Sequence, residues 1–180
     1  LANNASGSSH GIRHNSYHTV KSMRIVFADG SLLDTGDSES RRTFASTHPT
    51  LISEITLLHR EATGNRVIRD KIFRKFQLKN TCGYGVNALI DFDDPIEIIQ
   101  HLLIGSEGTL GFIAEVVYRT VIEHRHKASA LMYFPDIRTA CEATIILGCF
   151  PRTLVASQAV RMSGKYIRAL ALLRCPMTVR

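Results

Sequence analysis

The sequence lacks the features of a membrane-spanning or exported protein. None of its apolar runs approaches the roughly 20 residues that cross a bilayer. Its polar opening, LANNASGSSHG, has neither the basic nor the apolar region of a signal peptide. We therefore expect no integral membrane segment and no export.

Cysteine pairs of the metal-binding or disulfide type are also missing. The four cysteines form no Cys-x-x-Cys motif, so the sequence indicates neither a zinc cluster nor a disulfide framework. Reduced thiols in a cytoplasm are the plain interpretation. The cysteines are Cys82, Cys141, Cys149 and Cys175.

Common catalytic motifs are absent as well. The sequence has no P-loop lysine, no Rossmann glycine spacing and no G-x-S-x-G elbow, which disfavours ATP binding, NAD binding and hydrolysis. His10, His14 and His18 would align on a helix, but glycines and an asparagine between them break it. His124 and His126 would point to opposite sides of a strand. We therefore expect no metal site.

What is present indicates a globular protein of one domain, or pieces of two: 180 residues, of which 44% are apolar. The net charge of +6 comes from residues 151–180, which hold six basic residues and no acid. Residues 1–150 balance 16 basic against 16 acidic side chains. The basic tail is either an amphipathic helix for an acidic partner or, as we prefer, a poorly determined terminus. We expect no nucleic-acid partner.

Local patterns predict an alternation of strands and helices. SMRIVFADGSLLDTG reads as a hairpin around Asp29 and Gly30. A helix is expected from Pro49, which suits a first helical position, to Gly64, which suits a stop. A second helix is expected over residues 66–76, with a basic exposed side that we interpret as a solvated face.

The second half of the chain continues this alternation. Asp94 is expected to cap a short helix ending at Gly105, with Glu97 three residues after the cap. GFIAEVVYRTVIE and ASALMYFP read as strands. Asp136 is expected to cap a last helix with an apolar stripe of Ile137, Ala140, Cys141 and Ile145. The order of elements predicts an α+β fold, with a domain boundary at EHRHK, residues 123–127.

Two stretches of small residues suggest unusual backbone geometry. HLLIGSEGTLGFIAE carries three glycines within seven positions, which favours either a tight structural corner or the close approach of a ligand. NNASGSSHG could line a polar ligand such as a phosphate, or could be flexible. Composition leaves these alternatives open.

Four segments together resemble a known family. In order they are ANNASG, RHNSYHTVKSMRIVFADGSLLDTGD, LKNTCGYGVNALIDFDDP and HLLIGSEGTLGFIAEVVYRTV. They resemble the second half of the FAD-binding domain of FAD-linked oxidases of the vanillyl-alcohol oxidase type, which include D-lactate, D-2-hydroxyglutarate and glycolate dehydrogenases. The resemblance implies a second subdomain of a PCMH-type domain over residues 1–123, a mixed sheet flanked by helices. Residues 124–180 would begin a substrate or cap domain.

The resemblance also implies which residues contact FAD. Asn4–Gly7 match the loop that passes the flavin pyrophosphate. Arg13–Ser16 match a segment beside the cofactor, from whose usual sequence His14 and Asn15 depart. The Ser-Glu-Gly-Thr-Leu-Gly motif matches the corner after which Phe112 and Ile113 offer backbone groups. The implied cofactor-binding residues are Asn4, Ala5, Ser6, Gly7, Arg13, His14, Asn15, Ser16, Glu107, Gly108, Gly111, Phe112 and Ile113.

The expected activity is that of a fragment of an FAD-dependent oxidoreductase that oxidises a 2-hydroxy acid by hydride transfer to flavin. Relatives carry a first FAD subdomain before the position of Leu1 and most of a cap beyond the last matching strand and helix. We therefore expect no catalytic residue in this chain and weak FAD binding or none. The expected location is cytoplasmic, with peripheral attachment of the intact protein to the inner membrane left open. The alternative is an inactive α+β binding module or a truncated pseudoenzyme, in either case without cofactor. A basic tail that binds nucleic acid or an anionic membrane surface also stays open, ranked below the fragment.

Overall fold

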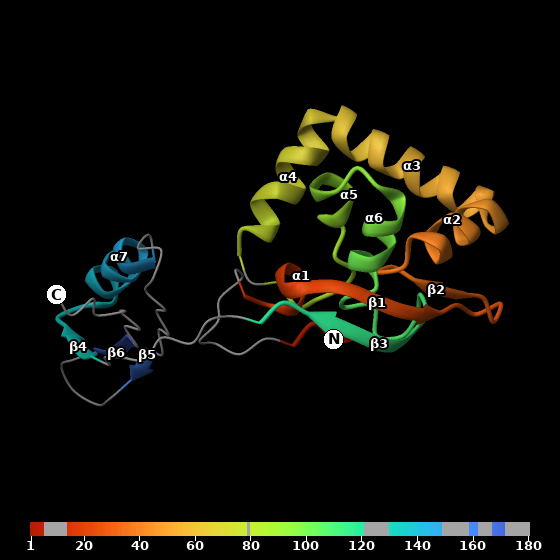
Figure 1. Ribbon diagram of the computed structural model, residues 1–180. Coiled ribbons are helices and arrows are strands. Elements are labelled where there is room, and N and C mark those ends of the chain that lie inside the picture. The colour runs from red at the N-terminus through yellow and green to blue at the C-terminus, as the bar shows by residue number, and fades with distance from the viewer. Residues whose placement is uncertain (6–13, 79, 121–129, 149–158, 162–166, 172–180) are drawn as a thin grey trace, which may run out of the picture. The chain divides into compact units, whose positions relative to one another are not determined.

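The computed structural model describes residues 1–5, 14–78, 80–120, 130–148, 159–161 and 167–171 (Figure 1). These residues form two compact units that divide between residues 120 and 121. The expected boundary segment EHRHK and the boundary between residues 123 and 124 lie outside the described residues.

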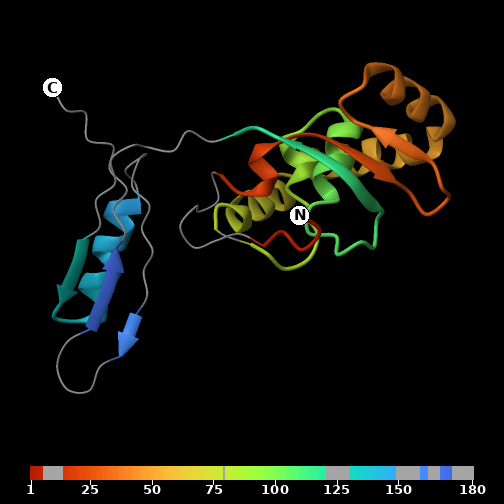
Figure 2. The ribbon, with the colours of Figure 1, turned by 60° about the horizontal axis from the view of Figure 1, so that its bottom comes forward.

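The first unit is built on a three-stranded antiparallel sheet in the order β2-β1-β3. Strand β1 spans Val20–Val26, β2 spans Leu32–Asp34 and β3 spans Phe112–Tyr118. The expected hairpin is confirmed: β1 pairs with β2 antiparallel, and Gly30 adopts a φ of 83° in the turn. Strand β3 lies on the other side of β1, with Val26 opposite Phe112 and Val20 opposite Tyr118 (Figure 2).

Helices cover one face of this sheet (Figure 1). A short helix α1 (Ser16–Thr19) precedes β1. Between β2 and β3 come α2 (Ser38–Thr47), α3 (Pro49–Gly64), α4 (Arg66–Phe76), α5 (Ala88–Asp91) and α6 (Pro95–Leu102). The core lies between the sheet and these helices, since the buried residues of β1 (Val20, Met23 and Ile25) belong to one hydrophobic cluster with the buried isoleucines of α6. Fully buried members include Ile25, Leu33 and Ile98.

Helix starts and stops agree with the local signals. Pro49 and Gly64 bound α3 as expected, and α4 covers the predicted residues 66–76. Asp94 caps α6 through the amide of Ile96, but the helix ends at Leu102, before Gly105. Helix α2 was not expected, because its sequence buries a single apolar residue, Phe44, and so carries no apolar stripe.

A charged cluster joins α2 to α6. The guanidinium of Arg41 donates to Glu97 Oε1 at 2.9 Å and to Asp94 Oδ2 at 2.7 Å. It also donates to the carbonyl oxygen of Thr35 at 2.9 Å. The side chain of Glu97, expected in a capping box, thus binds a neighbouring helix.

The second unit contains another three-stranded antiparallel sheet, in the order β4-β6-β5. Its strands are β4 (Ala130–Phe134), β5 (Ala159–Arg161) and β6 (Ile167–Ala171), and α7 spans Ile137–Gly148. The expected strand at ASALMYFP and the Asp136 cap, which accepts from the Thr139 amide at 2.8 Å, are confirmed.

One expectation for this unit is wrong. Within the proposed apolar stripe of α7, Ala140 is buried, but Cys141 is exposed and Ile137 and Ile145 are 57% and 68% exposed. Of the two interpretations of the basic tail, the amphipathic helix is contradicted at residues 159–161 and 167–171, because these residues pair with each other and with β4 as strands.

The expected α+β class is confirmed, but the expected mixed sheet is not: every strand pair in the described residues is antiparallel. The hairpin makes β1 and β2 antiparallel, and the helices after β2 return the chain beside β1 with β3 also running against it. No helix of the described residues combines the length and the apolar character needed to cross a bilayer.

Candidate functional site

The glycine-rich stretch forms a corner between α6 and β3, which we call the glycine corner, residues 105–111. Gly105 and Gly108 adopt positive φ angles of 87° and 81°. Glu107 lies between them with a φ of 54°, in the left-handed region that non-glycine residues seldom adopt. The chain is therefore bent through several uncommon conformations within four residues.

The N-terminal residues hold this corner from one side. The amide of Glu107 donates to the carbonyl oxygen of Ala2 at 2.8 Å, and the amide of Gly105 donates to that of Leu1 at 3.3 Å. The amide of Asn4 closes a turn on the same Leu1 oxygen at 2.9 Å. Asn4 and the glycine corner, which the sequence places a hundred residues apart, thus meet in space.

The segment from Asn80 to Tyr84 lies against the same contact. The side-chain amide of Asn4 donates to the Asn80 carbonyl oxygen at 3.3 Å. The hydroxyl of Tyr84 is hydrogen-bonded to Thr109 Oγ1 at 2.8 Å. This segment therefore supports the glycine corner.

The three glycines of the corner differ in what a side chain at their position would contact. A Cβ at Gly105 would lie 3.3 Å from both Asn4 Cβ and the Gly83 carbonyl oxygen. A Cβ at Gly111 would lie 3.3 Å from Ile25 Cγ2 and from the Val26 carbonyl oxygen. A Cβ at Gly108 would meet no atom of the described residues within 4 Å. Packing thus accounts for Gly105 and Gly111, whereas Gly108 is explained by its positive φ, which a side chain would strain.

Two buried polar atoms beside the corner have no hydrogen-bond partner among the described residues. They are Oδ1 of Asn4 and Oγ of Ser106, whose residue is 2% exposed. An unpaired buried polar atom costs free energy, so such atoms call for an explanation. A polar ligand at this wall could hydrogen-bond to them. Ser106 was missed as an individual site residue, although it lies inside the motif that pointed to the corner.

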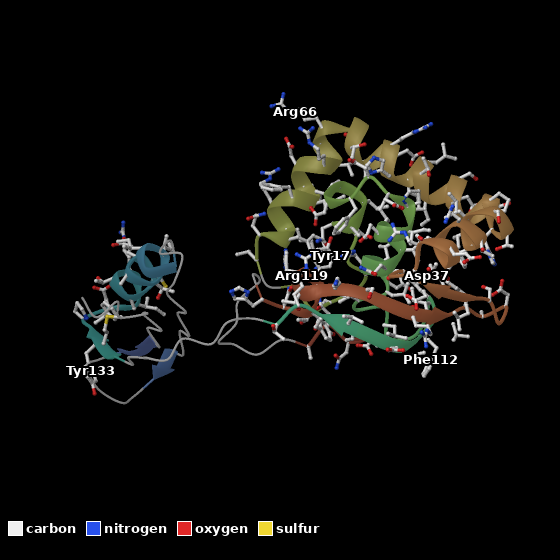
Figure 3. The ribbon with its side chains drawn as sticks, viewed as in Figure 1. Tyr17, Asp37, Arg66, Phe112, Arg119 and Tyr133 are labelled. Carbon is white, nitrogen blue, oxygen red and sulfur yellow. The ribbon has the colours of Figure 1, made fainter. Side chains whose placement is uncertain are left out.

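The expected cofactor-binding residues do not all meet at this point. Asn4, Glu107 and Gly108 lie at the contact just described, whereas Gly111 leads into β3. Ala5 is exposed, and its amide donates to Asn3 Oδ1 at 3.1 Å. Phe112 and Ile113 open β3, where Phe112 is 69% exposed and points away from the helices (Figure 3). Ser6, Gly7 and Arg13 lie outside the described residues.

The remaining expected residues, His14, Asn15 and Ser16, lie towards the other end of β3. The amide of Arg119, just beyond β3, donates to Thr19 at the end of α1, so α1 adjoins the Tyr118 end of the strand. Seven extended residues place this end about 20 Å from Phe112. Asn15 caps α1 by accepting from the His18 amide at 3.1 Å. Its side chain therefore has a structural partner already.

A buried polar cluster in the core of the first unit contains two groups whose pKa values are shifted, Tyr17 and His101. Tyr17 donates to Asp91 Oδ2 at 2.8 Å, and its ring meets the His101 ring edge-on with centroids 4.8 Å apart. Burial, and then the Asp91 charge, raise the pKa of Tyr17. Burial lowers the pKa of His101 from 6.5. Tyr17 stays protonated as a donor and His101 stays neutral at pH 7.

These groups are packed in the core, where Tyr17 is 6% and His101 4% exposed. No group of three or more potential metal ligands is found among the described residues. The described residues thus provide one wall that suits a polar ligand, the glycine corner with Asn4, and no arrangement that performs acid–base chemistry on a substrate.

Comparison of the chain with models of protein families, with curated proteins and with solved structures finds no match. The family resemblance therefore depends on the sequence motifs alone.

Proposed function

We propose that this chain is part of the FAD-binding domain of an FAD-dependent oxidoreductase, a PCMH-type second subdomain, whose intact form oxidises a 2-hydroxy acid. The observation that carries the proposal is the contact between Asn4 and the glycine corner. The two motifs that match the flavin-contacting segments of the family are distant in sequence and adjacent in space.

The residues at this contact fit one side of a dinucleotide site. Among the described residues, no atom lies within 4 Å of a Cβ placed on Gly108, so a ligand can approach the backbone there, and Ser106 Oγ and Asn4 Oδ1 have no hydrogen-bond partner. Asn4, Ser106 and Gly108 are the residues that would hold the cofactor there. When bound, FAD would supply the acceptor for the hydride of a 2-hydroxy acid. This chain contributes binding and orientation, and the catalytic groups belong to other parts of the intact protein.

The test is a titration of the isotope-labelled chain with FAD, followed through its backbone amide resonances. We expect weak binding, with shifts concentrated at Asn4 and at residues 105–113. Gly108→Ala should reduce these shifts, because its Cβ would occupy the open space. Gly30→Ala is the matched control: Gly30 has a φ of 83° and open space too, but lies in the β1–β2 hairpin.

Two results would favour the inactive binding module instead. In the first, the amide resonances do not shift at saturating FAD; in the second, Gly108→Ala and Gly30→Ala reduce the shifts equally. That alternative also predicts a cooperative unfolding transition that FAD does not move. A tight stoichiometric complex would contradict the expected weak binding while supporting the site.

A further inference from the structure

Helix α4 concentrates positive charge on the surface of the first unit. Its eleven residues, RVIRDKIFRKF, contain five basic side chains and one acidic one. That one, Asp70, lies 3.7 Å from Arg66 and 3.4 Å from Arg69. No carboxylate of the described residues forms an ion pair with Lys71, Arg74 or Lys75. The positive charge of α4 is therefore largely uncompensated.

Helix stability does not account for all of this charge. Arg66 and Arg69 lie in the first turns of α4, where the helix dipole disfavours cations. Only Arg74 and Lys75, in the last turn, are favourably placed. Arg66 projects away from the protein (Figure 3). Arg66 and Arg69 share the single carboxylate of Asp70, so one positive charge at the start of the helix, together with those of Lys71, Arg74 and Lys75, remains for an external anion.

Apolar side chains protrude between these cations. Val67 is 77% exposed and Phe73 is 57% exposed, and Leu78, two residues beyond the helix, is 73% exposed. No residue of α4 is buried. Ile68 is exposed as well, at 44%. We call the exposed charged and apolar side chains the α4 surface: Arg66, Val67, Ile68, Arg69, Lys71, Phe73, Arg74, Lys75 and Leu78.

We propose that the α4 surface binds the anionic face of a lipid bilayer. Cations attract acidic headgroups, and protruding apolar side chains between them can enter the boundary between headgroups and acyl chains. Nucleic acid would use the cations, but would leave aliphatic side chains such as Val67 and Leu78 without a partner. Because no residue of α4 is buried, the helix is accessible to an extended surface. This site is separate from the glycine corner and does not depend on flavin.

The test is sedimentation of the full chain with vesicles of phosphatidylcholine containing about one-third phosphatidylserine, compared with phosphatidylcholine alone. The four-fold variant Arg66→Gln, Lys71→Gln, Arg74→Gln and Lys75→Gln should lower the partition coefficient at least about tenfold. The matched control removes the same charge elsewhere, at the exposed residues Lys21, Arg42, Arg60 and Arg138. The basic tail is the same in both variants, so its contribution cancels.

A second variant tests the apolar part. The double variant Val67→Gln, Phe73→Gln leaves the net charge unchanged, and glutamine is a good helix former. Because salt screens the charges, the binding that remains at high salt depends on the apolar side chains, and this variant should weaken it. The proposal is overturned if the chain does not sediment with the anionic vesicles, or if the α4 and control variants lose binding equally. It is also overturned if the chain binds a DNA duplex but no vesicles. Unchanged binding of the Val67 and Phe73 variant at high salt would contradict insertion of these side chains.

Discussion

At the scale of single residues, Gly105 meets two demands at once: a φ of 87° and contact with Asn4 and Gly83. Gly105→Ala should lower the free energy of unfolding by about 2–4 kcal/mol, through backbone strain plus the displaced contact. Gly30→Ala has the same strain in open space and should cost about 1 kcal/mol. Chemical denaturation of both variants measures the difference, and equal losses would show that the Asn4 contact contributes little.

His101 should make stability depend on pH. Its ring is stacked on Phe92 with centroids 4.0 Å apart, and Nδ1 donates to the Glu97 carbonyl oxygen at 2.8 Å. Burial lowers its pKa below 6.5, against the opposing charges of Glu97 and Asp91, while His18 lowers it further. The folded state thus favours the neutral ring, so this stabilisation is complete above pH 6.5 and is lost as the pH falls below it.

The measurement is urea denaturation of the wild type and of His101→Phe at a series of pH values. Below pH 6.5, the free energy of unfolding of the wild type should fall by up to about 1.4 kcal/mol per pH unit more than that of the variant. Phenylalanine keeps the stacking and cannot titrate. Parallel pH profiles would rule out His101 as the source.

At the scale of elements, the guanidinium group of Arg41 joins α2 to α6 through several hydrogen bonds that the single ammonium of a lysine could not all make. It donates to Asp94, Glu97 and the Thr35 carbonyl oxygen, and the side chain is 24% exposed. Arg41→Lys keeps the charge but cannot make all three contacts, so it should lower the free energy of unfolding by about 1–2 kcal/mol.

The neighbouring Arg42 is the control for this substitution. It is exposed and donates to the Ser38 carbonyl oxygen within its own helix. Arg42→Lys should change stability by less than about 0.5 kcal/mol. Thermal unfolding of the two variants compares them, and an equal effect would show that the link between α2 and α6 is not stabilising.

At the scale of the whole molecule, the hydrophobic cluster of the first unit is contained within residues 1–116. Residues 1–120 produced alone should therefore unfold cooperatively, with a midpoint close to the corresponding transition in the full chain. Circular dichroism during heating measures this. A gradual loss of signal without a transition would show that the first unit needs the remainder of the chain.

The sequence alone determined the features whose causes are local. Pro49 and Gly64 bound α3, Asp94 and Asp136 cap α6 and α7, and the Asp29-Gly30 turn joins β1 to β2. Each depends on groups within a few residues of one another, so a short window of sequence contains the whole cause.

Only the tertiary structure decided the features that depend on distant partners. The carboxylate of Glu97 binds Arg41 rather than its own helix end, and residues 167–171 become a strand because β4 lies beside them. The contact of Asn4 with Gly105 joins opposite ends of the first unit. Such pairings are selected by burial and by backbone hydrogen bonds across the fold, which no local pattern of residues records.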